Sequence, residues 1–130
     1  MKKQSKQPIS KIQRQIWVEC RRIANDRYSN KNGQVDCYTC PAKDIQGSNK
    51  QLGHLWSKAT LSAYLKYDMR VLHWQCFRCN INGGGMGADY YARMLKEEGK
   101  EFMEELERDR KNTVKAYDFY VDLLIKYKQQ

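Results

Sequence analysis

The sequence contains no long apolar run. None of its segments approaches the roughly 20 consecutive apolar residues that a membrane-spanning helix needs, although the chain is 130 residues long. The basic start at residues 1–6 is not followed by the apolar stretch that a secretory signal requires. We therefore expect no membrane partner and a protein of the reducing cytosol, where disulfide bonds are rare.

Apolar residues and histidine are also scarce. Apolar side chains make up 41% of the sequence, which suffices for one domain, residues 1–130, with a modest core. A bound metal ion would add useful stability to such a core. Only two histidines, His54 and His73, are present, and His54 could be a core or surface histidine that caps backbone groups as well as a functional one.

Five cysteines are present, and four of them form two Cys-x-x-Cys pairs, Cys37 with Cys40 and Cys76 with Cys79. Each two-residue spacer makes a tight turn that presents both sulfurs to one ion, so the two pairs can close a tetrahedral zinc shell. The fifth, Cys20, falls on the apolar stripe of a predicted helix and is expected to be a buried, inert thiol. The sequence thus predicts one structural zinc site.

The formal net charge is +9, and most of the excess lies before the first cysteine pair. Residues 1–31 carry nine lysines and arginines against two acidic residues, whereas residues 91–130 balance at nine against nine. A basic helix face of this kind is typical of a protein that binds a nucleic acid. A solvated face that only aids solubility, or an anionic membrane surface, is the alternative. The expected DNA contacts on this helix are Lys11, Arg14, Arg21 and Arg22.

Periodicity and turn residues predict an α+β fold that is mostly helical. Residues 1–9 are expected to form a disordered basic tail. Residues 10–28 place apolar side chains three and four positions apart, which predicts a basic amphipathic helix with Ser10 as its N-terminal cap. A turn through Gly33 then leads to the first cysteine pair.

Residues 35–98 are expected to form the zinc-bound core. A short strand is predicted around His54. Residues 60–67 have apolar side chains at helical spacing, and residues 71–74 are expected to be extended. A helix capped by Asp89 is expected to follow the second cysteine pair.

Residues 100–128 are predicted to form closing helices. One runs over residues 100–111, and a second starts at Thr113. The apolar side of the second is expected to carry Val114, Tyr117, Val121, Leu124 and Ile125.

These motifs, in this order, resemble those of the NinG/Rap phage recombination proteins. The resemblance covers nearly the whole chain, and its most specific part is the block from His73 to Asn80, where Gln75 precedes the second cysteine pair and Asn80 follows it. The other matching residues are Trp17, the first cysteine pair, Gly53-His54-Leu55, residues 67–70, Tyr90 through Leu95, and Gly99. The closing helices are similar in placement only.

The resemblance implies an endonuclease of the HNH, or ββα-metal, class with a treble-clef fold that cuts branched DNA such as Holliday junctions. It implies that His54 is the catalytic histidine, that Asn80 binds a catalytic Mg²⁺ or Mn²⁺, and that the four paired cysteines bind structural zinc. A phage-encoded protein of this kind would act in the host cytoplasm. A homodimer would suit an enzyme that cuts two strands symmetrically.

The implied roles are chemically reasonable. A neutral imidazole near a water molecule can accept its proton near physiological pH, which makes His54 the candidate general base. The phosphate and the departing 3′ oxygen gain negative charge that a hard cation can stabilise, and Asn80 can offer that cation an oxygen. Zinc in an all-cysteine shell has no open position, so its role would be structural.

Two positions depart from the HNH pattern. Many HNH enzymes place an aspartate metal ligand directly before the histidine, where this chain has Gly53, so the cation would lack one carboxylate. The asparagine that usually orients the histidine loop is Val71 here. The spacing does not select among the residues that might supply further oxygens, which are Asp44, Asp68, Asn82 and Asp89.

Several side chains have both a functional and a structural interpretation. Arg70 and Arg78 suit phosphate contacts because a guanidinium fork matches phosphate oxygens, although a surface salt bridge would suit them equally. For His73 packing is favoured over binding of metal or phosphate.

Two other classes of function remain open beside the nuclease. A zinc-stabilised DNA-binding module without catalysis would bind DNA and not cut it. A protein–protein adaptor that displays the closing helices would bind nucleic acid only weakly and without salt dependence.

Overall fold

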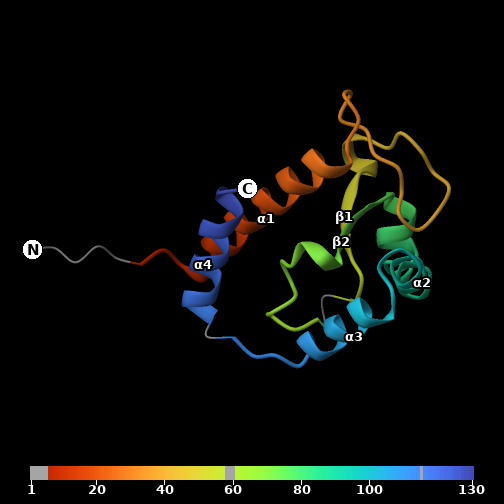
Figure 1. The fold of residues 1–130 in the computed structure, drawn as a ribbon. Coiled ribbons are helices and arrows are strands. Elements are labelled where there is room, and N and C mark those ends of the chain that lie inside the picture. Colours follow the sequence, from red (N-terminus) through yellow and green to blue (C-terminus); the bar gives the residue numbers. More distant parts are fainter. Residues whose placement is uncertain (1–5, 58–60, 115) are drawn as a thin grey trace, which may run out of the picture.

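The computed structural model describes residues 6–57, 61–114 and 116–130. The fold is mixed α+β and mostly helical with a small two-stranded sheet, as the sequence predicts. Within the described residues, no helix combines the length and apolar character needed to cross a membrane. The main elements are α1 (Ile9–Tyr28), β1 (Gln51–His54), β2 (Leu72–Gln75), α2 (Gly87–Glu98), α3 (Lys100–Asp109) and α4 (Ala116–Lys128) (Figure 1).

Helix α1 packs on the core by one apolar stripe. Its buried residues recur three or four positions apart and are Ile12, Ile16, Cys20, Ile23 and Ala24. The prediction that Ser10 caps the helix is wrong, because the helix begins at Ile9 after Pro8 and no side chain caps it. Ile9 therefore belongs to the helix and not to the predicted tail, of which residues 1–5 lie outside the described part.

Helix α4 lies beside α1 (Figure 1). Its buried residues are Tyr120 and Tyr127, two helical turns apart, whereas Ile125 of the predicted apolar side is 52% exposed. The helix also begins at Ala116 instead of Thr113. The Tyr127 hydroxyl donates to the Tyr67 carbonyl at 2.6 Å, so α4 is held by tyrosines that a simple apolar pattern does not single out.

Strands β1 and β2 form an antiparallel hairpin in which Gln51 pairs with Gln75 and His54 pairs with Leu72. The predicted strand around His54 and the extended segment before the second cysteine pair are both confirmed. The prediction of helical spacing at residues 60–67 is wrong: residues 63–67 form turns, and residues 58–60 lie outside the described part. Leu61 and Leu65 are buried without a helix.

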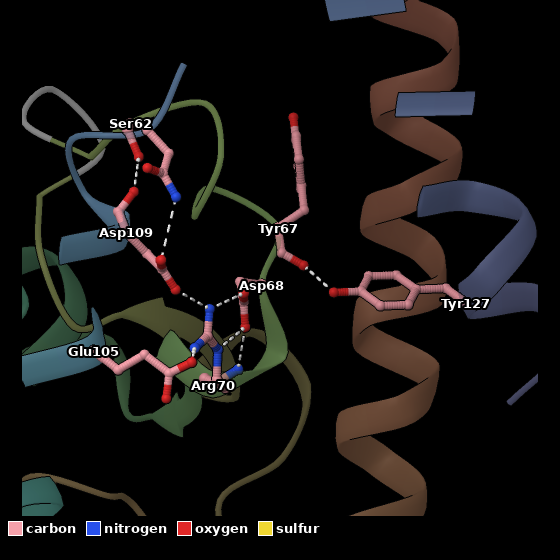
Figure 2. Close-up of polar contacts among 8 residues, drawn as sticks. Ser62, Tyr67, Asp68, Arg70, Glu105, Asp109 and Tyr127 are labelled. Carbon is pink, nitrogen blue, oxygen red and sulfur yellow. Dashed lines mark hydrogen bonds and ion pairs between the residues drawn. The ribbon is translucent and has the colours of Figure 1, made fainter. Parts of the chain in front are cut away.

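Arg70 ties the start of β2 to α3 through a cluster of carboxylates (Figure 2). It lies in a 3-10 turn, Met69–Val71, and its Nε and Nη2 donate to Asp68 at 3.0 and 2.8 Å. Nη2 also donates to Asp109 at 2.9 Å, at the end of α3. The hydrogen bonds that Arg70 donates to Asp68 raise the pKa of Arg70 against the effect of burial, so this charge is bound within the fold.

Helices α2 and α3 are separated by Gly99, whose φ of +89° favours glycine. The predicted cap at Asp89 is wrong by a few residues: α2 begins at Gly87, and Asp89 lies in its first turn. Helix α3 agrees with the prediction within two residues and buries Met103 and Leu106.

Candidate metal centre and the neighbouring cavity

The four paired cysteines come together at one end of the hairpin. Their Sγ atoms all lie within 4.8 Å of one another, and those of Cys40 and Cys76 are 3.7 Å apart. Four sulfurs around a zinc ion at tetrahedral geometry would be about 3.8 Å apart. The cluster can therefore bind a metal ion such as zinc, and its members are Cys37, Cys40, Cys76 and Cys79.

Backbone N–H groups of the cysteine turns point at two of the sulfurs. The Cys76 N–H donates to Cys37 Sγ at 3.3 Å, and the Ala42 N–H donates to Cys40 Sγ at 3.4 Å. Burial opposes a charge on Cys37, but the hydrogen bonds from Cys76 and Thr39 outweigh it and lower the pKa of this thiol to about 6. At Cys37 the fold thus favours the thiolate, which is the form that binds metal, whereas burial raises the pKa of the Cys40 and Cys79 thiols.

Cys20 lies apart from this centre, on the buried face of α1. Its side chain has no exposed surface, and its thiol donates to the Tyr67 carbonyl at 3.5 Å. Burial raises the pKa of Cys20 to about 12, which keeps the thiol protonated. The prediction that this cysteine is buried in the core is confirmed.

His54 ends β1 and is 8% exposed. Its Nε2 lies 2.8 Å from the Lys66 carbonyl oxygen, and its ring stacks on Trp17 of α1 with the ring centroids 5.6 Å apart. Because a carbonyl oxygen only accepts, Nε2 must carry the hydrogen, and the neutral ring has its lone pair on Nδ1. Lys66 therefore selects the tautomer, and Trp17 fixes the plane of the ring.

Asn80 lies in a π-helical turn, Arg78–Asn82, directly after the second cysteine pair. Its Nδ2 donates to Gln51 Oε1 at 2.8 Å. Asn80 and His54 line one cavity of about 520 Å³, whose other lining residues are Leu55, Trp56, Ser57, Ile81, Gly84, Gly85 and Gly87. Side chains alternate along a strand, so Gly53 faces Asn80 while His54 points to the opposite face.

Gly53 occupies a position that has no room for a side chain. A Cβ added there would lie 1.8 Å from Gln75 Oε1 and 3.0 Å from Asn80 Oδ1. Gln75 is fully buried on the partner strand, and its Oε1 has no hydrogen-bond partner among the described residues. The glycine at position 53 is therefore a steric requirement of this hairpin.

Tyr90 of α2 bridges the two strands next to His54. Its fully buried hydroxyl lies 2.9 Å from the Gly53 carbonyl and 3.1 Å from the Val71 carbonyl. The Val71 carbonyl also accepts from the Leu55 N–H at 2.9 Å. The Val71 side chain offers no polar group, so here the backbone of Val71 and the Tyr90 hydroxyl hold the histidine end of β1.

His73 packs behind this bridge. Its Nδ1 lies 3.2 Å from the Tyr90 hydroxyl, and its ring stacks on Tyr38 with the ring centroids 3.9 Å apart. Burial lowers the pKa of His73 to about 4, so the imidazole is neutral at physiological pH. These contacts support the packing interpretation of His73.

The six basic residues expected to contact DNA fall into three groups. The guanidinium groups of Arg22 and Arg70 form contacts within the protein. Arg22 donates to Glu19, Asp26 and the Tyr127 carbonyl. Arg70 donates to its carboxylate cluster. Arg21 lies over the Trp74 ring at 5.2 Å. The remaining three are exposed, and no side-chain partner is found for them among the described residues: Lys11, Arg14 and Arg78.

A second cavity, of about 590 Å³, flanks the other side of His54. Arg14 and Lys66 bring positive charge to it, and Trp17, Val18 and Tyr67 form an apolar wall. The two cavities thus share His54 as a lining residue.

The fold and site define a small α+β protein with a four-cysteine cluster that can bind a metal ion. No known protein family matches this chain, and no curated protein or solved structure is significantly similar to it.

Sequence reasoning missed the roles of Gln75 and Tyr90. Gln75 stands directly before the second cysteine pair, and a polar residue in a strand that reads as buried could have indicated a structural or ligand role. Tyr90 has no comparable signal, because only the fold brings its hydroxyl 37 residues back along the chain to Gly53.

Proposed function

We propose that this protein is a metal-dependent, structure-specific DNA endonuclease of phage recombination. The observation that carries the proposal is the cavity at the end of β1 that both His54 and Asn80 line, although their side chains belong to opposite faces of the hairpin; Asn80 directly follows the second cysteine pair. A base and an oxygen ligand at one cavity are two parts that phosphodiester hydrolysis needs. The sequence also resembles the NinG/Rap proteins, which implies an HNH-like treble clef. A hairpin followed by a turn that carries the second cysteine pair is consistent with such a fold.

His54 acts as the general base in this proposal. The Lys66 carbonyl keeps the hydrogen on Nε2, so Nδ1 accepts the proton from the attacking water. Trp17 restricts rotation of the ring, and the Tyr90 bridge fixes the backbone before it. These contacts position the imidazole before the substrate arrives.

Zinc in the four-cysteine centre has a structural role. Four thiolates leave no open position for water. The centre joins the segment before β1 to the turn after β2, and Asn80 follows its last cysteine. Zinc bound there would hold in place the turn from which Asn80 contacts Gln51 of β1.

A second metal, Mg²⁺ or Mn²⁺, fits the donor atoms around Asn80. Hard cations prefer oxygen ligands, and the side-chain oxygens of Asn80 and Gln75 lie beside Gly53. When bound, this cation would stabilise negative charge on the phosphate and on the departing 3′ oxygen.

The DNA contacts belong to the exposed basic residues. Arg14 and Lys66 border the cavity beside His54, and Lys11 precedes Arg14 by one helical turn. Arg78 begins the turn that carries Asn80. A strand that crosses His54 would meet these charges on both sides. Cutting both strands of a junction symmetrically would require a homodimer.

The test is cleavage of labelled four-way junction, flap and linear duplex by zinc-loaded protein, with and without Mg²⁺ or Mn²⁺. We expect cutting that requires the divalent cation and prefers branched DNA. Asn80→Ala should lower the rate about 100-fold, because a ligand of the cation is lost. Asn32→Ala, at an exposed asparagine that does not line this cavity, should cut like the wild type and serves as the matched control.

A catalytically inactive, zinc-stabilised DNA-binding module is the second candidate. It is favoured by Gly53, where the usual aspartate ligand has no room. Salt-dependent binding without any cutting by folded, zinc-loaded protein would select this module and contradict the nuclease.

A further inference from the structure

We propose that Gln75 is a ligand of the catalytic cation and replaces the side chain missing at Gly53. This inference rests on the proposed nuclease function. It is carried by two amide oxygens, Gln75 Oε1 and Asn80 Oδ1, which converge beside the Gly53 Cα. Neither the motif spacing nor the HNH pattern assigns a role of this kind to Gln75.

The orientation of the Asn80 amide is fixed by a chain of hydrogen bonds. Gln51 Nε2 donates to the Ser48 carbonyl at 3.1 Å, and because a carbonyl only accepts, Gln51 must turn its Oε1 elsewhere. That oxygen accepts from Asn80 Nδ2 at 2.8 Å. Asn80 Oδ1 is therefore the atom that faces Gly53.

The orientation of the Gln75 amide is fixed in the same way. Its Nε2 donates to the Gly85 carbonyl and to Thr39 Oγ1, each at 2.9 Å. Exchanging the nitrogen and oxygen would set two carbonyl oxygens against each other at Gly85. Gln75 Oε1 must therefore face Gly53, where it is buried and has no hydrogen-bond donor among the described residues.

Two acceptor oxygens that face one position repel each other unless positive charge or a hydrogen donor lies between them. The Gln75 amide already fills the space that a Cβ at Gly53 would take, 1.8 Å from Gln75 Oε1 and 3.0 Å from Asn80 Oδ1, so a cation would have to bind next to these oxygens and not in the place of a Cβ. A hard divalent cation satisfies both oxygens at once. Gln75 thus brings from β2 an oxygen that an aspartate at position 53 would have brought from β1.

The four-cysteine centre holds both ligands in place. Gln75 directly precedes Cys76, and Asn80 directly follows Cys79. Thr39, which accepts from Gln75, lies between the cysteines of the first pair. Structural zinc and catalytic cation would therefore be coupled through residues adjacent in the sequence.

Manganese binding without DNA tests this assignment. The protein is first loaded with one equivalent of zinc, which occupies the cysteines because thiolates prefer zinc to manganese. Mn²⁺ is then added, and free Mn²⁺ is measured by electron paramagnetic resonance. We expect one Mn²⁺ site in the wild type. Asn80→Ala and Gln75→Met, which lack one oxygen each, should bind at least about tenfold more weakly.

Two further variants separate ligand loss from misfolding. Gln75→Glu keeps Oε1 and adds charge, so Mn²⁺ binding at least as tight as in the wild type is expected if Oε1 is a ligand; its second oxygen would face the Gly85 carbonyl in place of Nε2, so its fold is checked with that of the other variants. Gln46→Met, at an exposed glutamine, should bind like the wild type. Zinc content and the circular dichroism spectrum of each variant report its fold.

Two results would overturn the assignment. In the first, folded Gln75→Met binds Mn²⁺ like the wild type while Asn80→Ala does not; Gln75 is then structural, and the nuclease proposal stands. In the second, the wild type binds no Mn²⁺, which indicates that a donor such as water satisfies the two oxygens. Cleavage assays would then decide separately whether the protein is a nuclease.

Discussion

At the scale of single residues, the packing of the hairpin depends on a glycine at position 53. Gly53 has no side chain because Gln75 occupies the space from the partner strand. The hydroxyl of Tyr90 contacts the carbonyls on either side of the same point, at Gly53 and Val71. The backbone before His54 is therefore held by groups that come from β2 and α2.

Replacing Gly53 with alanine should destabilise the protein by about 1–3 kcal/mol, because a methyl group overpacks this point in the core. Most of that cost should disappear in the Gln75→Ala background, where the opposing amide is absent. Gly87→Ala is the control, since nothing lies within 4 Å of a Cβ added there. Urea denaturation measures all four variants, and an equal cost of Gly53→Ala in both backgrounds would contradict the steric account.

At the scale of elements, strong local patterns predicted α1, both strands and α3. The two Cys-x-x-Cys pairs also predicted the cysteine cluster, because a two-residue spacer presents both sulfurs of a pair to the same ion. The pattern failed at residues 60–67, where Leu61 and Leu65 are buried by tertiary contacts of a turn segment. It also failed in α4, where buried Tyr127 is anchored by a hydrogen bond that apolar periodicity does not indicate.

The sequence predicts the net charge of the protein but not which basic side chains form ion pairs in the fold. Arg22 and Arg70 belong to the predicted DNA contacts, yet their donors are engaged by carboxylates of the protein itself. Glu19 and Asp26 lie three and four positions from Arg22 on the same helix, so helical spacing can indicate these pairs. Asp109 lies 39 residues after Arg70, and this partner cannot be assigned from spacing. Exposed Arg14 is the better candidate for phosphate contact.

Arg14→Ala should weaken binding of branched DNA several-fold and lower the salt dependence by about one ion, because one phosphate contact is lost. Lys31→Ala removes the same charge beyond the far end of α1, roughly 20 Å or more from Arg14, and should change affinity little. Fluorescence anisotropy over a range of salt concentrations checks both. Equal effects of the two variants would indicate general charge attraction without a defined DNA path.

At the scale of the whole molecule, three separate parts of the chain converge on His54. Helix α1 supplies Trp17, the connection between the strands supplies the Lys66 carbonyl, and α2 supplies Tyr90. The four-cysteine centre adds Asn80 to the shared cavity. Cleavage would therefore depend on the complete fold, and the central claim is that His54 is its general base.

The most direct test is single-turnover cleavage of a four-way junction by zinc-loaded wild type and His54→Ala, at saturating protein with Mg²⁺ or Mn²⁺. The account predicts a fall of about 10²–10⁴-fold in rate, with unchanged DNA affinity and partial recovery when imidazole is added. His54→Ala that cuts at the wild-type rate while folded and zinc-loaded, or a wild type that binds the junction and never cuts it, would contradict the account.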